Sequence, residues 1–486
     1  MVSEQIFECQ KIEEVLGWRV FGLKEKDKAK VVSTTSRTRD SREIVQEKSG
    51  KLIYLLKNTP ELSIDEAKLL RNTLEYYRNN STNSKENSQN SVLETYCKKT
   101  HINLDKDQKK YLQKMIENIT KPAGILTNLL EDKELEEIAV IGLGKSKPVY
   151  VFDSIFGWLP TNLYFSDSSE IKTIVNAMAG TIGRRLTLQN PRLNAVLSDG
   201  SRLNACIEPA SVSGPSLTIR KFREQPFTPT DLVDIGSVSI GQLAFLWMAI
   251  QADCSLLVCG NTGSGKTTLL NSLLNFVPAN ERIILVEETP EINVPHKHFV
   301  KLANADSIDL GMQELITNTL RMRPDRVIVG EIRDQKEQKA FMDSLLAGQG
   351  KGCYGTFHAQ SAKEAISRMK NLGALEIDLA SLDLIITQKR WSNYSKKTSS
   401  EERKLIEICE IYENNNQTNA RKLFEYNFEK RIFESKNESK KILEKILRSF
   451  NFKKKEFKKE LESRKKILKS MRGKTQEEFF NGIQKQ

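Results

Sequence analysis

Short apolar runs alternate with helical patterns through the middle of the chain, over residues 230–391. Consecutive apolar residues are typical of buried strands, whereas apolar residues spaced three and four apart indicate helices. The runs predict strands at 256–259, 283–286, 327–329, 353–357 and 384–387. Because strands that alternate with helices form a parallel sheet covered by helices, the pattern predicts an α/β domain over residues 230–430.

The preceding region, residues 96–222, has a more mixed pattern. Helical spacing appears at 109–119 and 170–180, and strand-like runs appear at 138–141, 149–152, 202–207 and 217–219. Asp199 and Gly200 stand between apolar flanks, and this dipeptide favours a hairpin turn. The region is therefore predicted to be a smaller α+β domain. Two prolines within residues 223–229 indicate the connector to the sheet domain.

The N-terminal residues 1–95 are predicted to form a helical or mixed segment. Residues 63–66 have the pattern of a capping box, and apolar residues follow at helical spacing from Leu70. Residues 79–91 are almost all Asn, Ser and other polar residues, which cannot bury apolar surface. They are therefore predicted to be a mobile linker.

After the sheet domain the pattern changes again. Two strands are expected at 403–411 and 423–426, joined by a polar turn at 414–416. Residues 431–486 are predicted to form a basic helical tail, helical from Phe433 onward. Its apolar stripe consists of Ile442, Leu443, Ile446, Leu447 and Phe450. Three interpretations of the tail stay open: it could bind nucleic acid, lie on an anionic membrane face, or pack on a partner as a solvated amphipathic helix.

Charge and cysteines narrow the class of protein. The 486 residues carry a formal net charge of +12, and residues 436–472 alone hold 15 Lys/Arg against 5 Asp/Glu, so the basic excess belongs to the tail. No apolar run approaches the roughly 18 residues of a membrane span, and the first residues do not resemble a secretory signal. Seven scattered cysteines fit reduced thiols in a cytosolic protein, with Cys254 and Cys259 as core residues.

One motif supplies candidate chemistry. Residues 260–267 read G-x-x-x-x-G-K-T, the pattern of a phosphate-binding loop, between an expected strand and a helix with a leucine face. Its glycines let backbone N–H groups surround phosphates, and the helix N-terminus adds partial positive charge. Lys266 can reach the β- and γ-phosphates of ATP, and the Thr267 hydroxyl is placed to bind Mg²⁺. The alternative is a glycine-rich turn without nucleotide. The predicted nucleotide-binding residues are Gly260, Asn261, Thr262, Gly263, Ser264, Gly265, Lys266, Thr267 and Thr268.

Such a loop works with an acid at the end of a neighbouring strand, which holds Mg²⁺ or orients the attacking water. Glu331 follows Gly330 at the end of the run 327–329, and Glu287 ends the run 283–286. Ligands bind at the carboxyl ends of strands in such sheets, so both acids can face the phosphates. Each acid alone could be part of a solvated turn, but three converging strand ends favour a site.

A histidine and several arginines complete the candidates. His358 follows the expected strand 353–357 and could sense the γ-phosphate or link the acid strand to the loop, although spacing alone slightly favours an ordinary structural histidine. Phosphoryl transfer also needs positive charge at the departing oxygens, often from an arginine of a neighbouring subunit. Any of the candidate arginines could instead be a surface charge. These arginines are Arg202, Arg220, Arg321 and Arg323.

Together these motifs resemble the secretion ATPase superfamily, which powers type II secretion, type IV pili and archaeal surface filaments, and most of all its archaeal branch with the archaellum motor ATPase. Four boxes stand in the family's order, and stretches of the first domain and of residues 386–391 also match. The likeness covers about residues 124–426 and leaves out the first hundred residues and the basic tail. The four boxes are residues 260–267, 286–296, 320–334 and 355–359.

The resemblance implies a RecA-like core and a homohexameric ring in which ATP lies between the two domains of one subunit, near the next subunit. It implies that Glu287 is the catalytic carboxylate, that Glu331 is the acid for Mg²⁺ and water, and that His358 senses the phosphate state. Arg202 and Arg220 would contact phosphate. These residues, with Thr267 as the second metal ligand, are the predicted site.

Three departures from the family pattern stand out. Glu288 occupies a position where the family usually has Asp, and Val196 and Ser198 occupy positions where many members have Arg and Pro. The paired-cysteine zinc module of some bacterial relatives is missing from the sequence. No metal other than Mg²⁺ is therefore expected.

The preferred hypothesis is a cytoplasmic ATPase motor, peripheral on the cytoplasmic membrane face, that drives assembly of a pilus-like or archaellum filament or protein secretion. Its partners would be a polytopic membrane platform protein and, indirectly, filament subunits. One alternative is a DNA-translocating motor of conjugation type that grips nucleic acid with the tail. Another is an ATP-binding scaffold with little turnover.

Overall fold

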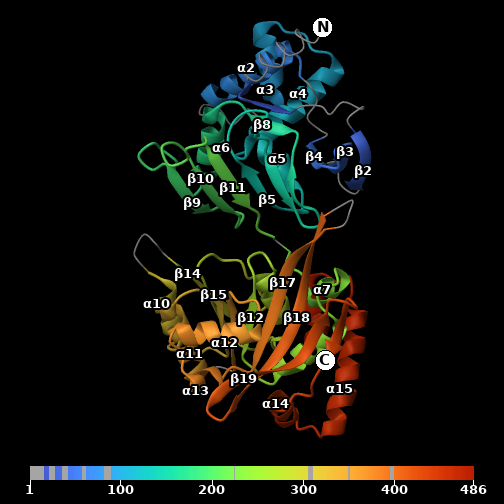
Figure 1. Cartoon of the computed structure of the whole chain (residues 1–486). Coiled ribbons are helices and arrows are strands. Elements are labelled where there is room, and N and C mark those ends of the chain that lie inside the picture. The colour runs from blue at the N-terminus through green and yellow to red at the C-terminus, as the bar shows by residue number, and fades with distance from the viewer. Residues whose placement is uncertain are drawn as a thin grey trace. The chain divides into compact units, whose positions relative to one another are not determined.

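The computed structural model describes residues 16–20, 28–35, 42–56, 62–80, 89–223, 225–304, 310–347, 351–394 and 399–485. The chain forms two compact units (Figure 1). The first consists of Met1–Arg223 with Tyr394–Ser400, and the second of Glu224–Asn393 with Glu401–Gln486. The boundary therefore lies at Arg223, at the start of the expected connector.

The first unit is built around a six-stranded antiparallel sheet in the order β7-β6-β5-β11-β10-β9. Asp199 and Gly200 lie in the β9–β10 turn, as expected. The sheet strands are β5 (Leu135–Val140), β6 (Tyr150–Asp153), β7 (Gly157–Pro160), β9 (Arg192–Val196), β10 (Arg202–Cys206) and β11 (Ser216–Arg220). The other elements are β1 (Trp18–Val20), β2 (Lys28–Thr35), β3 (Arg42–Glu47), β4 (Leu52–Leu56), β8 (Leu163–Phe165), α2 (Ile64–Asn80), α3 (Gln89–Thr100), α4 (Lys106–Ile119), η2 (Gly124–Leu126), α5 (Thr127–Glu131) and α6 (Ser168–Gly180).

The described residues within 1–95 pack onto the core of this sheet. Buried side chains of α2 and α3, such as Leu70 and Leu93, share one core with Ile219 of the sheet. The expected capping box is present, because the Glu66 N–H donates to Ser63 Oγ at 3.2 Å.

The expected linker at 79–91 was too long. Its first two residues end α2 and its last three begin α3, while residues 81–88 lie outside the described part. Packing between the two helices, with the Tyr76 and Tyr96 rings 5.7 Å apart, extends the helices into residues of modest helix propensity.

The second unit contains a nine-stranded sheet in the order β14-β13-β15-β16-β12-β17-β18-β19-β20. Neighbouring strands from β14 to β17 are parallel, which confirms the expected α/β core. The strands are β12 (Leu256–Gly260), β13 (Ile283–Glu287), β14 (Phe299–Ala303), β15 (Arg326–Ile332), β16 (Gly352–Phe357), β17 (Leu384–Tyr394), β18 (Ser399–Asn414), β19 (Gln417–Asn427) and β20 (Ile432–Ser435). The helices are α7 (Pro229–Asp234), α8 (Ile240–Gln251), α9 (Lys266–Leu273), η3 (Leu274–Phe276), α10 (Met312–Thr319), α11 (Gln335–Leu346), α12 (Ala362–Asn371), α13 (Glu376–Leu379), α14 (Lys441–Ser449), α15 (Lys454–Ser470) and α16 (Gln476–Gln484).

Alternating side chains of β12 fill a core on each face of this sheet. Leu256 and Val258 belong to the cluster that contains residues of α8, α9 and α14–α16. Leu257 and Cys259 belong to the cluster of α10–α12. The expected core role of Cys259 is thus confirmed, and the sheet is covered on both sides, as parallel sheets are.

The C-terminal residues do not form a separate tail. The expected helix at Phe433 is wrong, because Phe433 lies in β20, where its ring is 5.1 Å from that of Tyr426 on β19. Ile442, Ile446 and Phe479 have no exposed surface and pack into the core of the second unit. The apolar stripe is real, but it packs within this unit. Among the described residues, no helix is long and apolar enough to span a bilayer.

Candidate functional site

The glycine-rich loop connects the end of β12 to the start of α9, as the pattern predicts. A Cβ on Gly260 would stand 2.1 Å from the Gln388 carbonyl oxygen of β17, so only glycine fits there. Gly265, with φ +91°, takes a left-handed conformation immediately before Lys266 starts the helix. Loop and helix N-terminus together form a cradle of the kind that binds phosphate.

Residues of β17 and β18 hold the loop in place. The Asn261 side chain donates to the Arg390 carbonyl and accepts from the Arg390 N–H, both at 3.0 Å. Arg403 Nε donates to the Gly263 carbonyl at 3.0 Å. No local pattern points to Arg403, and the only signal for Arg390 was the likeness of residues 386–391 to the family.

A chain of hydrogen bonds runs from the loop lysine to the acid of β15. The Lys266 side chain, 7 % exposed, has its Nζ 3.5 Å from Nδ1 of His358. His358 Nε2 lies 2.6 Å from Oε1 of Glu331. Because an ammonium group can only donate, Nδ1 accepts, and Nε2 carries the proton that goes to Glu331. The geometry thus selects one neutral tautomer of the histidine.

The surroundings support these protonation states. Burial lowers the pKa of His358, and the charge of Lys266 adds to that effect, so the ring stays neutral at neutral pH. Burial alone would raise the pKa of Glu331, but the hydrogen bond and charge of Arg333, with the charge of Lys266, outweigh it and lower the pKa. Glu331 is therefore a carboxylate.

Arg333 is a site neighbour that sequence reasoning missed. Its Nε donates to Glu331 Oε2 at 2.6 Å, and its Nη1 donates to Glu288. The signal was its place in the box 320–334, two residues after Glu331. Arg333 thereby links Glu331, near the end of β15, to Glu288, which follows β13.

Glu287, at the end of β13, is 3 % exposed. Its Oε1 accepts the N–H groups of Glu291 and Ile292 at 2.9 and 3.0 Å, while its Oε2 is buried without a hydrogen-bond partner in the described structure. A Cβ on Gly330 would stand 3.0 Å from Cγ of Glu287, so the glycine leaves space for this side chain beside β15. Burial raises the pKa of Glu287 to about 7, although the two N–H groups oppose the shift.

The candidate arginines lie elsewhere. Arg202 and Arg220 are directly opposite each other on β10 and β11 of the first unit, an arrangement that like charges disfavour. Arg321 and Arg323 are exposed and precede β15, at the opposite end of that strand from Glu331. Within the second unit, the structure brings together the loop, both acids and His358, but neither Arg321 nor Arg323.

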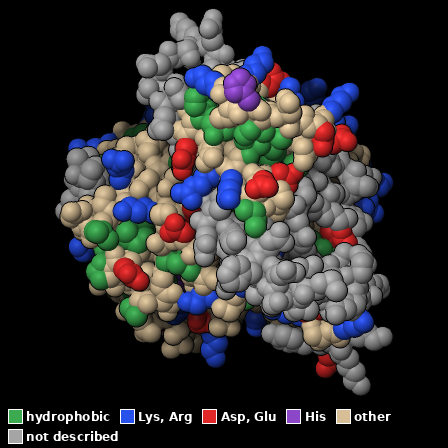
Figure 2. Space-filling view, turned by 90° about the horizontal axis from the view of Figure 1, so that it is seen from above, with side chains coloured by type: hydrophobic (Ala, Val, Ile, Leu, Met, Phe, Trp, Pro, Cys, Tyr) green, Lys and Arg blue, Asp and Glu red, His purple; other side chains and the backbone are tan. Residues whose placement is uncertain are grey.

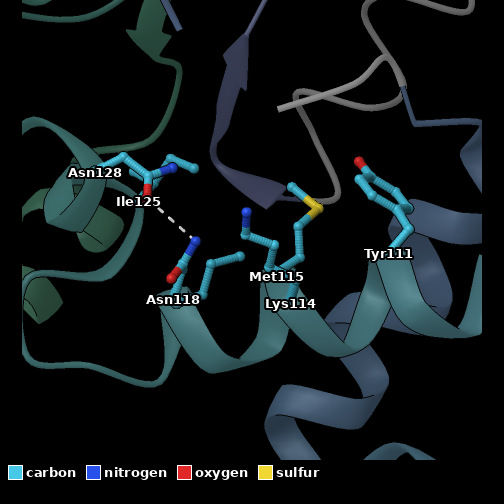
Figure 3. Close-up of a pocket in the computed structure, with 7 residues that line it drawn as sticks. Tyr111, Lys114, Met115, Asn118, Ile125 and Asn128 are labelled. Carbon is cyan, nitrogen blue, oxygen red and sulfur yellow. Dashed lines mark hydrogen bonds between the residues drawn. The ribbon is translucent and has the colours of Figure 1, made fainter. Parts of the chain in front are cut away.

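The first unit contains a separate pocket between α4 and the η2–α5 segment (Figure 3). The side chains of Asn118 and Asn128 point toward each other there, with Asn118 Nδ2 donating to Asn128 Oδ1 at 3.2 Å. None of the predicted site residues lines it. The lining residues are Tyr111, Lys114, Met115, Asn118, Ile119, Ile125 and Asn128.

A family model described as Type II/IV secretion system protein matches residues 163–484, more than half of the chain. The chain belongs to the type II/IV secretion system protein family. The match includes almost all of residues 431–486, so the expectation that the C-terminal residues lie outside the likeness was wrong.

Individual relatives place the chain within the family. An uncharacterised protein of Methanocaldococcus jannaschii is 40 % identical over 236 residues, which are 46 % of this chain and 32 % of that protein. The type IV secretion system protein VirB11 of Bartonella quintana is 28 % identical over 325 residues, 56 % of this chain and 89 % of that protein. The M. jannaschii relative fits the archaeal branch, and the chain spans about a third of that relative's length.

The chain is also similar to solved structures, of which one is a pilus motor. The structure of the pilus retraction motor PilT with bound ADP aligns with a TM-score of 0.43 and 18 % identity, over 60 % of this chain and 84 % of that one.

Proposed function

We propose that this secretion-family protein is an ATP-hydrolysing motor that works as a hexameric ring. The observation that carries the proposal is the hydrogen-bonded chain from Lys266 through His358 to Glu331, at the mouth of the phosphate-binding loop. The ends of β12, β13, β15 and β16 meet at one edge of the sheet, which is where ligands bind in folds of this class.

The residues present fit ATP and Mg²⁺. The loop offers backbone N–H groups and a lysine, Thr267 offers a hydroxyl at the start of α9, and Glu331 offers a carboxylate. The buried Oε2 of Glu287 is an acceptor without a partner, as a water-binding atom would be. Bound ATP would supply the phosphoanhydride bond, and Mg²⁺ would neutralise charge on the phosphates.

Each side chain then has one task. Lys266 holds the terminal phosphates, and Thr267 and Glu331 hold the metal. Glu287, with its pKa raised to about 7, takes the proton of the attacking water. His358 reports the phosphate state, because a phosphate that draws Lys266 away breaks its contact with Nδ1.

The finer assignments follow from membership of the family. Arg202 and Arg220 are proposed to contact phosphate, since two like charges paired across strands are stabilised by a bound anion. The work performed is proposed to be assembly of a pilus-like or archaellum filament, or protein secretion. A polytopic membrane platform protein at the cytoplasmic membrane face is the proposed partner.

A conjugation-type DNA motor is the second candidate, since α15 keeps several lysines exposed, among them Lys454, Lys458 and Lys466. On the face shown in Figure 2, by contrast, acidic side chains are interspersed among the basic ones over the described surface. Turnover that rises on addition of single- or double-stranded DNA, with strong salt dependence, would favour this candidate.

Phosphate release from ATP tests the main proposal. The full chain should hydrolyse ATP with Mg²⁺, and Lys266→Ala and Glu331→Gln should each abolish turnover while the protein stays folded. A Lys266→Ala variant with full activity would refute the site. Binding of an ATP analogue without any turnover by the unaltered chain would indicate the scaffold instead.

A further inference from the structure

The C-terminal helix α16 packs against the segment that holds Glu287, and the proposed function gives it no role. We propose that α16 is a positioning element for the carboxylate of Glu287, acting through Gln476 and Phe480. This inference rests on the proposed function, in which Glu287 takes the proton of the attacking water. The inference concerns the orientation of the Glu287 carboxylate, not its role as the proton acceptor.

Glu287 is held by the segment that follows it. Residues 288–298 connect β13 to β14 without any helix or strand of their own. Two of their N–H groups, those of Glu291 and Ile292, bind Oε1 of Glu287. The orientation of the carboxylate, and hence the direction in which Oε2 points, depends on where this segment lies.

Two contacts hold the segment from the α16 side, and a shared hydrophobic core adds to them. Gln476 Nε2 donates to the Asn293 carbonyl at 3.2 Å. The Phe480 ring stands edge-on to the His296 ring, with centroids 4.7 Å apart. Ile292, which has no exposed surface, shares a core with residues of α16. The two contacts fall on Asn293 and His296, shortly after Ile292, whose N–H binds Glu287.

The helix itself is fixed independently of the site. Thr475 and Glu478 form a capping box immediately at its start, with Glu478 N–H donating to Thr475 Oγ1 at 3.3 Å. Gln484 Nε2 donates to the Val277 carbonyl at 3.0 Å, and His296 Nε2 donates to the same carbonyl at 3.0 Å. Helix and segment are therefore both anchored to the Val277 carbonyl.

An irregular segment has few internal hydrogen bonds, so external contacts determine its position. A misplacement of about 1 Å near a reacting group costs on the order of 100-fold in rate. Loosening the segment also weakens the two N–H contacts that oppose the rise in the pKa of Glu287. Loss of the α16 contacts should thus lower kcat and move the pH dependence.

The experiment compares variants of the full chain for kcat, KM for ATP, and the acid limb of the pH–kcat profile. Phe480→Ala should lower kcat about 10- to 100-fold and Gln476→Ala about three- to tenfold, with KM changed less than about twofold. In both, the acid limb should move to higher pH. Phe480→Leu should recover part of the loss. Glu477→Ala and Asn481→Ala, at exposed positions of the same helix, are the controls and should behave as the unaltered chain.

The outcomes separate the two proposals. An unaltered chain without ATP turnover refutes the proposed function itself. An active chain whose Gln476→Ala and Phe480→Ala variants keep kcat and the acid limb overturns the role of α16. A fall in kcat without a shift of the acid limb of the pH–kcat profile also overturns the role of α16. So does a rise in KM alone. If Phe480→Ala does not fold, Gln476→Ala decides, because it leaves the core side chains in place.

Discussion

The strand β15 has a charged network at each end, and the two networks differ in how completely they are satisfied. At the amino end, Arg326 has no exposed surface, and its three guanidinium nitrogens donate to Glu281 at 2.5 Å, to Asp253 at 2.8 Å and to Tyr354 at 2.9 Å. At the carboxyl end, Glu331 and its neighbours are part-exposed, and Glu287 keeps an oxygen without a partner.

The comparison indicates that the amino end of β15 contributes mainly to stability and the carboxyl end to the proposed reaction. A buried charge whose hydrogen bonds are all made has nothing left to offer a ligand, and removing it leaves its partners uncompensated. Groups held by long contacts at an accessible edge, such as Lys266 at 3.5 Å from His358, can exchange those contacts for phosphate. We therefore expect mutations at the two ends to affect different measurements.

The largest expected effect is on turnover at the carboxyl end. Lys266→Ala should lower kcat/KM for ATP about 100- to 1000-fold or more, because it removes a preorganised charge from the transferring phosphate. The free energy of unfolding should change by less than about 1 kcal/mol, since the lysine's contacts to the Gly260 and Asn261 carbonyls are long. Phosphate release and urea unfolding measure the two. A large loss of stability in Lys266→Ala would contradict the expected difference between the two ends of β15.

The converse is expected at the amino end. Arg326→Ala should lower the free energy of unfolding by about 3–5 kcal/mol, because Glu281 stays buried without its partner. Where the variant is folded, kcat should stay within about twofold of the unaltered value. The control replaces both charges, Arg326→Met with Glu281→Leu, and should regain much of the lost stability. Loss of turnover in that folded double variant would contradict the expectation that the amino end of β15 affects stability and not turnover.

A third prediction uses pH on Glu287. Its pKa rises from 4.5 to about 7 on folding, so its contribution to stability is fully present below about pH 4.5 and is lost as pH rises through about 7. The Glu287→Gln variant has no ionisable group at this position, so its free energy of unfolding should not fall in this way. Its unfolding free energy relative to the unaltered chain should therefore increase by up to about 3 kcal/mol between those pH values.

The same group should shape the activity profile. The kcat of the unaltered chain should rise with pH through about 7 as Glu287 ionises, and Glu287→Gln should have almost no turnover. A flat profile, or unfolding curves of the two proteins that run parallel from pH 4.5 to 7, would remove Glu287 from the role of base.

The smallest effect is expected for Arg333, which is half exposed. Arg333→Ala should lower kcat about tenfold, because Glu331 loses the hydrogen bond and charge that lower its pKa. Stability should change by less than about 1 kcal/mol, as for other exposed ion pairs. Lys336→Ala, at an exposed position on α11, is the matched control and should have no effect. Equal effects of both variants would place Arg333 outside the site.

Local pattern was enough for the elements of the second unit that are strongly apolar or have distinctive turns. The five expected strands are all present because each is a continuous buried run. The β18–β19 turn is also present, with Asn415 and Asn416 at φ +51° and +57°, a conformation that Asn tolerates. By contrast, β14 was missed, since its residues are exposed or only partly buried at the sheet edge.

Long-range contacts account for most of the rest. Gln476 and Asn293 are 183 residues apart in the chain, and no local pattern connects them. The burial of α14–α16 also depends on long-range contacts. Their basic outer residues dominate the composition, so the sequence pattern predicted an exposed tail. In the candidate site, the loop and the acids at strand ends were accessible from spacing. Arg333 and the anchoring residues of β17 and β18 act through geometry that only the folded chain defines.

The lack of clearance between Gly260 and the Gln388 carbonyl has a mechanical consequence. With Asn261 clasped to Arg390 as well, the nucleotide loop and β17 can shift only as one piece. The last residue of β17, Tyr394, is already grouped with the other unit. Any displacement produced at the loop would therefore pass along the whole length of β17, without the need for a separate lever.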